Sequence, residues 1–112
     1  MMLFQPHHIP LIQDHTKTQS RRMWDIARVK EGSFQQVKTK IFTKEHHGYL
    51  KVEKVYRQQL LDITEEDAQK EGGYTREKYL AEFRRIYPHV QANPLVFVVE
   101  FEYVGMSKEI KS

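Results

Sequence analysis

The stretch Asp14-His15-Thr16-Lys17-Thr18-Gln19-Ser20-Arg21-Arg22 contains no apolar residue, and lysine or arginine fills three of its nine positions. A core strand has an apolar residue at every second position, and an amphipathic helix has one at every third or fourth, so the segment fits neither pattern. Apolar residues flank it, with Ile12 before it and Met23 and Trp24 after it. A polar, cation-rich segment between two apolar anchors is typical of a binding loop or of a strand within a site.

The side chains of this stretch suit an anion or a polar heterocycle. In an extended chain, Ser20 and Arg22 point to one face and Lys17 points to the other. A turn at residues 18–19 would bring the three together and let Lys17 approach the Ser20 hydroxyl. A solvated basic loop has the same composition, and spacing alone leaves both interpretations open.

The length and composition of the chain limit its class. Its 112 residues suit one domain with its own core. The sequence has no cysteine, which excludes disulfides and thiolate chemistry. It shows no signal-peptide pattern and no apolar run of membrane-spanning length. We therefore expect a cytoplasmic protein that does not contact a membrane.

The charge of the chain is unevenly distributed. The formal net charge is +3, with an excess of cations up to Arg57 and an excess of anions between Asp62 and Glu82. Lys38 and Lys40 share one face of a predicted strand, which makes them a candidate basic strip. A basic surface of this kind indicates an acidic partner such as RNA, although an ordinary solvated sheet face has the same pattern.

The pattern of the remaining chain predicts an α+β domain at residues 1–104 and a flexible tail at residues 105–112. We expect a short helix at residues 6–14 and strands at residues 34–42, 49–60 and 95–104, where β-branched and aromatic residues dominate. A pair of helices is expected before the last strand, with Thr64 and Thr75 as N-caps and Gly72-Gly73 between the helices. This order predicts a small, mixed, mostly antiparallel barrel closed by its helices.

Two histidine pairs, His7-His8 and His46-His47, invite a metal-site interpretation. Neighbouring histidines on a helix point in different directions, and no carboxylate stands at helical ligand spacing to complete a set. We therefore expect neither a metal nor another cofactor.

With these elements placed, the sequence resembles an ASCH domain of the PUA-like superfamily. The family pattern Gly-x-Lys-x-x-Thr-x-Arg follows a short helix, and Lys17 and Arg22 match it, while Ser20 stands for Thr and His15 replaces Gly. Further matches are Asp62-Ile63-Thr64-Glu65-Glu66-Asp67-Ala68, Ile86-Tyr87-Pro88 and Val99-Glu100-Phe101. The resemblance covers nearly all of the chain and implies a PUA-like β-barrel.

The resemblance also implies a function. PUA-like domains generally bind RNA, and some small single-domain ASCH proteins are amidohydrolases that remove the acetyl group of N4-acetylcytidine. The Lys, Thr and Glu of that subgroup fall on Lys17, Ser20 and Glu71. In the implied chemistry Ser20 attacks the amide carbonyl, Lys17 takes its proton, and Glu71 protonates the leaving nitrogen or orients water. Arg22 or main-chain N–H groups would stabilise the oxyanion.

A non-catalytic RNA-binding module is the alternative. In that case Lys17, Arg21 and Arg22 would contact phosphates in the same cleft. Lys38, Lys40 and Arg57 would extend the basic patch. A ribonuclease is a third interpretation, although no pair of histidines or carboxylates demands it. The expected partner is RNA or a modified nucleoside, and the sequence makes no prediction about oligomeric state.

Overall fold

A single five-stranded sheet forms the frame of the protein. The structure is a computed structural model, and it describes residues 1–107. The strand order is β1-β3-β4-β5-β2, and every neighbouring pair is antiparallel except β1 and β3. The elements follow the chain as β1 (Met2–Leu3), the 3₁₀ turn η1 (Pro6–His8), α1 (Ile9–Gln13), β2 (Gln19–Arg22), β3 (Phe34–Lys38), β4 (Tyr49–Gln59), the 3₁₀ turn η2 (Leu60–Asp62), α2 (Glu65–Gly72), α3 (Arg76–Ile86) and β5 (Leu95–Gly105). The predicted α+β class and mostly antiparallel sheet are confirmed.

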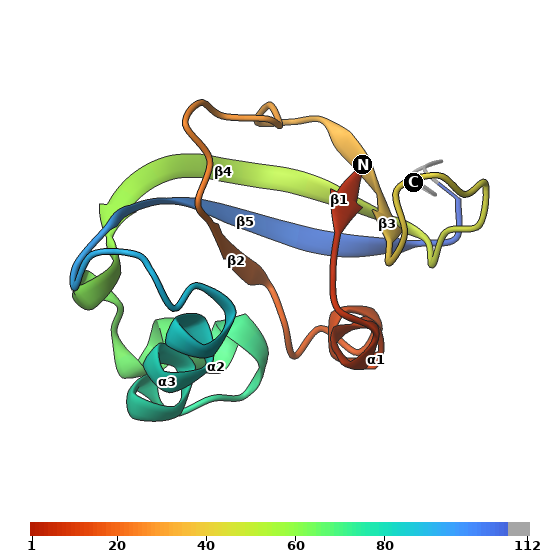
Figure 1. The fold of residues 1–112 in the computed structure, drawn as a ribbon. Coiled ribbons are helices and arrows are strands. Elements are labelled where there is room, and N and C mark those ends of the chain that lie inside the picture. Colours follow the sequence, from red (N-terminus) through yellow and green to blue (C-terminus); the bar gives the residue numbers. More distant parts are fainter. Residues whose placement is uncertain (108–112) are drawn as a thin grey trace.

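The long pair formed by β4 and β5 spans the molecule (Figure 1). The register between them shifts between Val52 and Lys54, which is where the apolar alternation of Leu50 and Val52 moves by one position to Val55. Residues 96–99 of β5 are all buried, as expected for a central strand that is apolar on both faces. β5 therefore provides the platform on which the polar strand β2 pairs.

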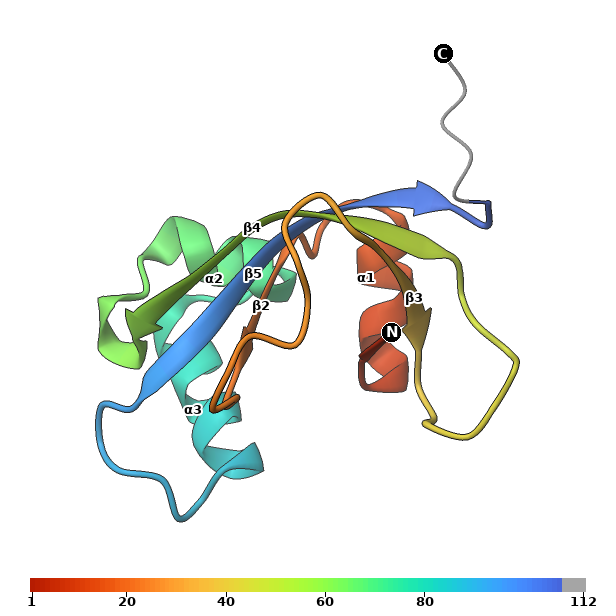
Figure 2. The same cartoon turned by 90° about the horizontal axis from the view of Figure 1, so that it is seen from above.

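Two apolar cores pack on the two faces of β5. Val99 and Phe101 belong to a core that also contains Phe4 and, from α1, Ile9 and Ile12. Val96 and Val98 point to the opposite face of β5 and belong to a second core. The other members of that core are Leu60, Ile63, Ala68, Tyr79 and Phe83. Figure 2 shows α2 and α3 together at one end of the β4–β5 pair, while α1 lies at the other end, near β3. The polar strand β2 lies between these two groups of helices.

The helix ends follow the predicted signals. The Thr64 side chain accepts a hydrogen bond from the Asp67 N–H, and the Asp67 side chain accepts one from the Thr64 N–H, which forms a capping box. Thr75 caps α3 in the same way through the Lys78 N–H. Gly73 ends α2 in the left-handed region at φ 81°. These local signals fix where α2 stops, and α2 carries part of the site described below.

Three expectations differ from the structure. The strand predicted at residues 34–42 ends at Lys38, because its pairing with β1 also ends there. The strand β1 was not predicted, since two residues carry no periodicity. Within residues 1–107 the sheet stays open, with β1 and β2 at its edges, so the barrel is not confirmed. The reason is that β1 is short and the chain turns directly into η1 and α1.

Most of the segment predicted as a tail, residues 105–112, lies outside the described residues. No helix within residues 1–107 is long and apolar enough to cross a membrane.

Replacing Thr64 by Ala removes one bond of the capping box. We expect Thr64→Ala to lower the free energy of unfolding by about 1 kcal/mol, because an Asp67 N–H at the start of α2 loses its acceptor. Thr64→Ser keeps the hydroxyl and should stay close to the wild type. Urea denaturation followed by circular dichroism measures both, and an equal loss in the Ser and Ala variants would contradict the capping argument.

Candidate functional site

The polar stretch forms β2, an edge strand whose side chains alternate between two sides. Arg21 points toward α2, where its guanidinium reaches the Glu71 carboxylate. Ser20 and Arg22 point to the other side, where Arg22 lies over the Phe4 ring. The strand therefore sends its cations into two different environments on either side of the sheet edge.

The carboxylate of Glu71, in the last turn of α2, lies in the interior and is only 2% exposed. Oε1 accepts a hydrogen bond from Lys17 Nζ at 3.2 Å, and Oε2 accepts one from Arg21 Nη1 at 2.8 Å. Lys17 Nζ also donates to the Glu71 main-chain oxygen at 2.8 Å, where a cation satisfies a carbonyl at the end of a helix. A buried carboxylate needs such partners, because an unpaired one is strongly disfavoured.

The Lys17 ammonium has no unused donor. Its three N–H groups match three acceptors, which are the Gln19 main-chain oxygen at 2.8 Å and the two Glu71 oxygens. Burial lowers the pKa of Lys17, and the charge of Glu71 opposes this effect. A neutral amine would turn a lone pair toward an oxygen, so the geometry favours the ammonium. Before it could take a proton from Ser20, the Lys17 ammonium would have to lose a proton and turn its lone pair away from these acceptors.

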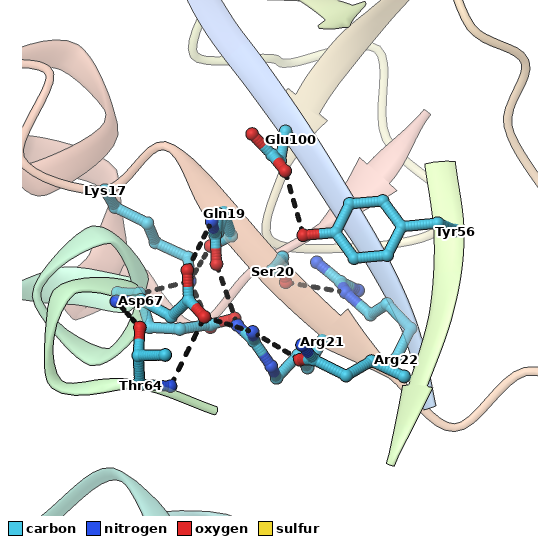
Figure 3. A network of polar contacts seen from close by, with 11 residues as sticks. Lys17, Gln19, Ser20, Arg21, Arg22, Tyr56, Thr64, Asp67 and Glu100 are labelled. Atoms are coloured by element: carbon cyan, nitrogen blue, oxygen red, sulfur yellow. Dashed lines mark hydrogen bonds and ion pairs between the residues drawn. The ribbon is translucent and has the colours of Figure 1, made fainter. Parts of the chain in front are cut away.

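The Arg21 guanidinium joins β2, β4 and α2 in one network (Figure 3). Nη1 donates to Gln19 Oε1 at 2.9 Å, and Nη2 donates to Gln58 Oε1 at 2.8 Å. Asp67 lies 3.5 Å from Nη2, and its carboxylate also accepts from Gln19 Nε2 at 3.1 Å. Because Asp67 belongs to the capping box of α2, the start of that helix and the site are held by the same carboxylate.

Arg22 differs from Lys17 and Arg21 in its partners. Its Nε donates to Ser20 Oγ at 2.9 Å, and its guanidinium lies 4.8 Å from the centre of the Phe4 ring. No carboxylate within residues 1–107 forms an ion pair with it. Burial lowers the pKa of Arg22, yet a guanidinium stays charged in proteins. Arg22 is therefore the cation of this site that can pair with a ligand.

A cavity of about 400 Å³ opens beside β2, between the N-terminal segment and α3. This volume falls within the range of about 300–1,000 Å³ that is typical of small-molecule sites. Aromatic rings form much of its wall, together with the polar cluster around Glu71. The residues that line it are Leu3, Phe4, Gln5, Pro6, His8, Lys17, Ser20, Arg21, Arg22, Thr39, Glu71, Tyr74, Tyr79, Glu82, Phe83, Ile86 and Tyr87.

One polar contact crosses the cavity wall between η1 and the turn that joins α2 to α3. His8 Nε2 and Tyr74 Oη lie 3.2 Å apart, within hydrogen-bond distance. Burial and the nearby charge of Lys17 lower the pKa of His8 to about 3. The imidazole is therefore neutral near pH 7, and it adds a polar group to the wall without adding a charge.

The geometry can be compared with known proteins. No protein-family model matches the sequence, and no curated protein matches it either. A solved ASCH domain from Lactobacillus crispatus superposes with a TM-score of 0.71, at 15% identity over 87% of this chain and 70% of that one. The chain has the fold of an ASCH domain. A DUF984 protein from Enterococcus faecalis has the same arrangement, with a TM-score of 0.72 at 18% identity over 89% of this chain and 68% of that one.

Within this ASCH fold, five of the eight predicted site residues line the cavity. They are Lys17, Ser20, Arg21, Arg22 and Glu71. Residues from α2 and β2, about 50 positions apart in the chain, meet there. The predicted meeting of Lys17 with Ser20 and Arg22 takes a different form, because Lys17 pairs with Glu71 and Ser20 pairs with Arg22.

The other three predicted binding residues are not among those that line the cavity. Lys38 is buried and donates to the Thr43 main-chain oxygen at 2.6 Å, while Lys40 is exposed in the loop after β3. Arg57 lies 4.9 Å from the Phe97 ring beside a separate hollow of about 180 Å³. The strand order explains the position of Arg57, because β5 separates β2 from β4. Near Lys38 and Lys40 the cavity is lined by Thr39, the residue between them.

Sequence reasoning missed two parts of the site. The helical spacing of Tyr79 and Phe83 is that of core residues, and both rings pack in the second core. The same rings also line the cavity, which the spacing does not indicate. The amides of Gln19 and Gln58, which hold Arg21 in place, were not singled out. The one available signal was the i, i+2 spacing of Gln19 and Arg21 on one side of an extended segment.

Removing the Glu71 carboxylate leaves Lys17 and Arg21 buried without their shared partner. We expect Glu71→Ala to lower the free energy of unfolding by about 3–5 kcal/mol, the usual loss when a buried ion pair is broken on one side. Glu66→Ala is the matched control on the same helix, because Glu66 is 80% exposed and, within residues 1–107, pairs with Lys70 alone. It should change stability by less than about 0.5 kcal/mol. Denaturant unfolding measures both, and similar losses in the two variants would contradict the buried role of Glu71.

Acid should weaken the protein through His8. The unfolded chain binds a proton at His8 below its ordinary pKa of 6.5, whereas the folded protein binds it only near 3. Stability therefore falls as the pH drops through this window. We expect His8→Gln to lose less unfolding free energy than the wild type between about pH 7 and about pH 4. His89→Gln, at an exposed position, should follow the wild type. Parallel curves for all three proteins would contradict the assignment.

Proposed function

We propose that the cavity beside β2 binds a nucleobase, supplied by RNA or by a modified nucleoside. The observation that carries this proposal is the guanidinium of Arg22, which lines a cavity walled by aromatic rings and lacks a carboxylate partner in the described structure. Bases offer flat π-faces for aromatic stacking and ring oxygens and nitrogens as acceptors. The ASCH fold suggests an RNA-related role.

The electrostatics of the site support the same ligand. Three buried or half-buried cations (Lys17, Arg21 and Arg22) face two carboxylates (Glu71 and Asp67). A third carboxylate, Glu82, also lines the cavity, but it forms an ion pair with Arg85. One positive charge is therefore left over, and it belongs to Arg22. This balance favours a neutral, polarised ring or a group with partial negative charge, and it disfavours a cation. Phosphates that flank the base can add to the attraction.

Hydrolysis of N4-acetylcytidine is the second candidate, favoured because Lys17, Ser20 and Glu71 line the same cavity. Ser20 Oγ would attack the acetyl carbonyl, the C–N bond would break, and the leaving N4 would take a proton. Water would then cleave the acetyl-serine ester and release acetate. For Lys17 to accept the Ser20 proton, its ammonium must first pass one proton to the hydrogen-bonded Glu71 carboxylate and turn the freed lone pair toward Ser20. Glu71 would then hold the proton that the leaving N4 takes, so hydrolysis requires a rearrangement of this buried pair on ligand binding.

Binding is tested by titrating the protein with cytidine in a calorimeter. We expect Arg22→Gln to weaken binding about tenfold or more, because a hydrogen bond from a charged group contributes about 1.5–3 kcal/mol. Arg57→Gln is the matched control, since Arg57 also lies over an aromatic ring but outside this cavity. No heat of binding from cytidine or from a short single-stranded RNA would refute the proposal.

Hydrolysis is tested by incubating the protein with N4-acetylcytidine and following cytidine by chromatography. We expect Ser20→Ala to abolish release, and Ser20→Thr to retain it because the hydroxyl is kept. These variants leave the buried Lys17–Glu71 pair in place, so a loss of activity is separated from a loss of fold. Absence of cytidine at high concentrations of the wild-type protein would eliminate this candidate and leave the binding proposal standing.

A further inference from the structure

At the cavity, one residue of β2 turns its main-chain N–H and C=O away from the neighbouring strand. The Thr18 main-chain oxygen accepts a hydrogen bond from the Phe101 N–H at 3.0 Å. Together with the register, this bond shows which residues of β2 turn their main-chain groups toward β5. In an antiparallel ladder, alternate residues bond to the partner strand and those between them turn their N–H and C=O away. Ser20 and Arg22 therefore bond to β5 through their main chains, and Arg21 turns its N–H and C=O to the open edge.

An independent contact confirms which residues of β2 face the open edge. Gln19, two positions before Arg21, has the same orientation in the strand, and its main-chain oxygen accepts the bond from Lys17 Nζ on the open side. That contact occupies the carbonyl of Gln19. The carbonyl and N–H of Arg21 have no partner of this kind among the hydrogen bonds of residues 1–107 outside regular helices and ladders.

The exposure of Arg21 places its main chain in the cavity wall. Its side chain has 0% exposure, whereas the whole residue is 4% exposed and lines the cavity. The accessible surface of Arg21 therefore belongs to the main chain. A buried N–H or C=O without a partner is unfavourable, so this pair of groups suits a ligand with complementary polar atoms.

We infer that the Arg21 main-chain N–H and C=O form hydrogen bonds with the edge of the bound base, an inference that rests on the proposed function. In an extended residue the N–H and C=O point the same way, side by side. They match a planar ring that presents an acceptor directly beside a donor, as cytosine does with N3 and its N4 amine. The Arg21 N–H donates to the ring nitrogen, and the Arg21 C=O accepts from the amine.

The same geometry disfavours an extended peptide as the ligand. A peptide that adds a strand to a sheet edge needs a row of free main-chain groups. Here the polar edge offers one residue, since Lys17 blocks the carbonyl of Gln19. A single donor–acceptor pair beside aromatic rings fits the edge of one base, such as cytosine. An N4-acetylated cytosine keeps one N4–H, so the acetylated nucleoside can form the same two hydrogen bonds with the Arg21 main chain.

Amide hydrogen exchange followed by NMR tests this inference residue by residue. We expect saturating cytidine to slow exchange of the Arg21 amide by about tenfold or more, because the N–H gains an acceptor. The Ser20 and Arg22 amides are the internal controls, since they already bond to β5, and they should change by less than about twofold. A general stiffening of β2 would instead slow all three amides together.

Two analogues identify the atoms on the ligand. 3-Deazacytidine lacks the N3 acceptor, and N4,N4-dimethylcytidine lacks the N4 donor. Each should bind about threefold to tenfold more weakly than cytidine, and 3-deazacytidine should leave the exchange of the Arg21 amide unchanged. N4-methylcytidine keeps one donor and is the matched control for added bulk.

The outcomes separate the inference from the function on which it rests. If cytidine binds while the Arg21 amide exchanges as before, or while all three amides slow equally, the inference is overturned and the proposed function stands. If neither cytidine nor a short single-stranded RNA binds, both are overturned. Selective protection of the Arg21 amide by cytidine, lost with 3-deazacytidine, supports both.

Discussion

The carboxylate of Glu71, shared in the interior by Lys17 and Arg21, is the interaction on which the geometry of the site depends. A charge taken out of water is strongly disfavoured unless opposite charges and hydrogen bonds replace its hydration. Here each carboxylate oxygen has one cationic partner, and the Lys17 ammonium has an acceptor for each of its donors. The end of α2 is thereby tied to β2 through Arg21 and to the segment just before β2 through Lys17, although 54 positions separate Lys17 from Glu71.

This constraint explains how a strand without an apolar residue is held at the edge of a sheet. β2 gains its main-chain bonds from β5, the most apolar strand, and its inward-facing side chains gain theirs from α2 and β4. Open strand edges readily pair with other chains, and charged side chains limit that tendency. The cations of β2 thus have a structural role as well as a place in the site. The part of the edge that stays open is the main chain of Arg21.

The three cations of the site divide their roles according to their partners. Lys17 donates each of its N–H groups to an oxygen, and Arg21 donates from both terminal nitrogens while its buried Nε has no partner within residues 1–107. These bonds hold both cations in the floor of the cavity. Arg22 has a hydroxyl and an aromatic face, both weaker partners than a carboxylate, so it keeps its capacity for a ligand. The aromatic wall and neutral His8 add shape and polarity without charge. These contacts suit the proposed binding of a base better than they suit proton transfer by Lys17.

The sequence by itself determined the features that depend on neighbouring residues, which are the caps at Thr64 and Thr75 and the long strands. It also singled out the polar stretch as a candidate site. Resemblance to a family added Glu71. Only the tertiary structure decided that the sheet stays open, that Lys38, Lys40 and Arg57 lie away from the cavity, and which cation lacks a carboxylate. Caps and periodicity act within a few residues, whereas the pairing of a charge depends on which strands and helices meet. Those meetings are set by the packing of the whole chain, and no local pattern records them.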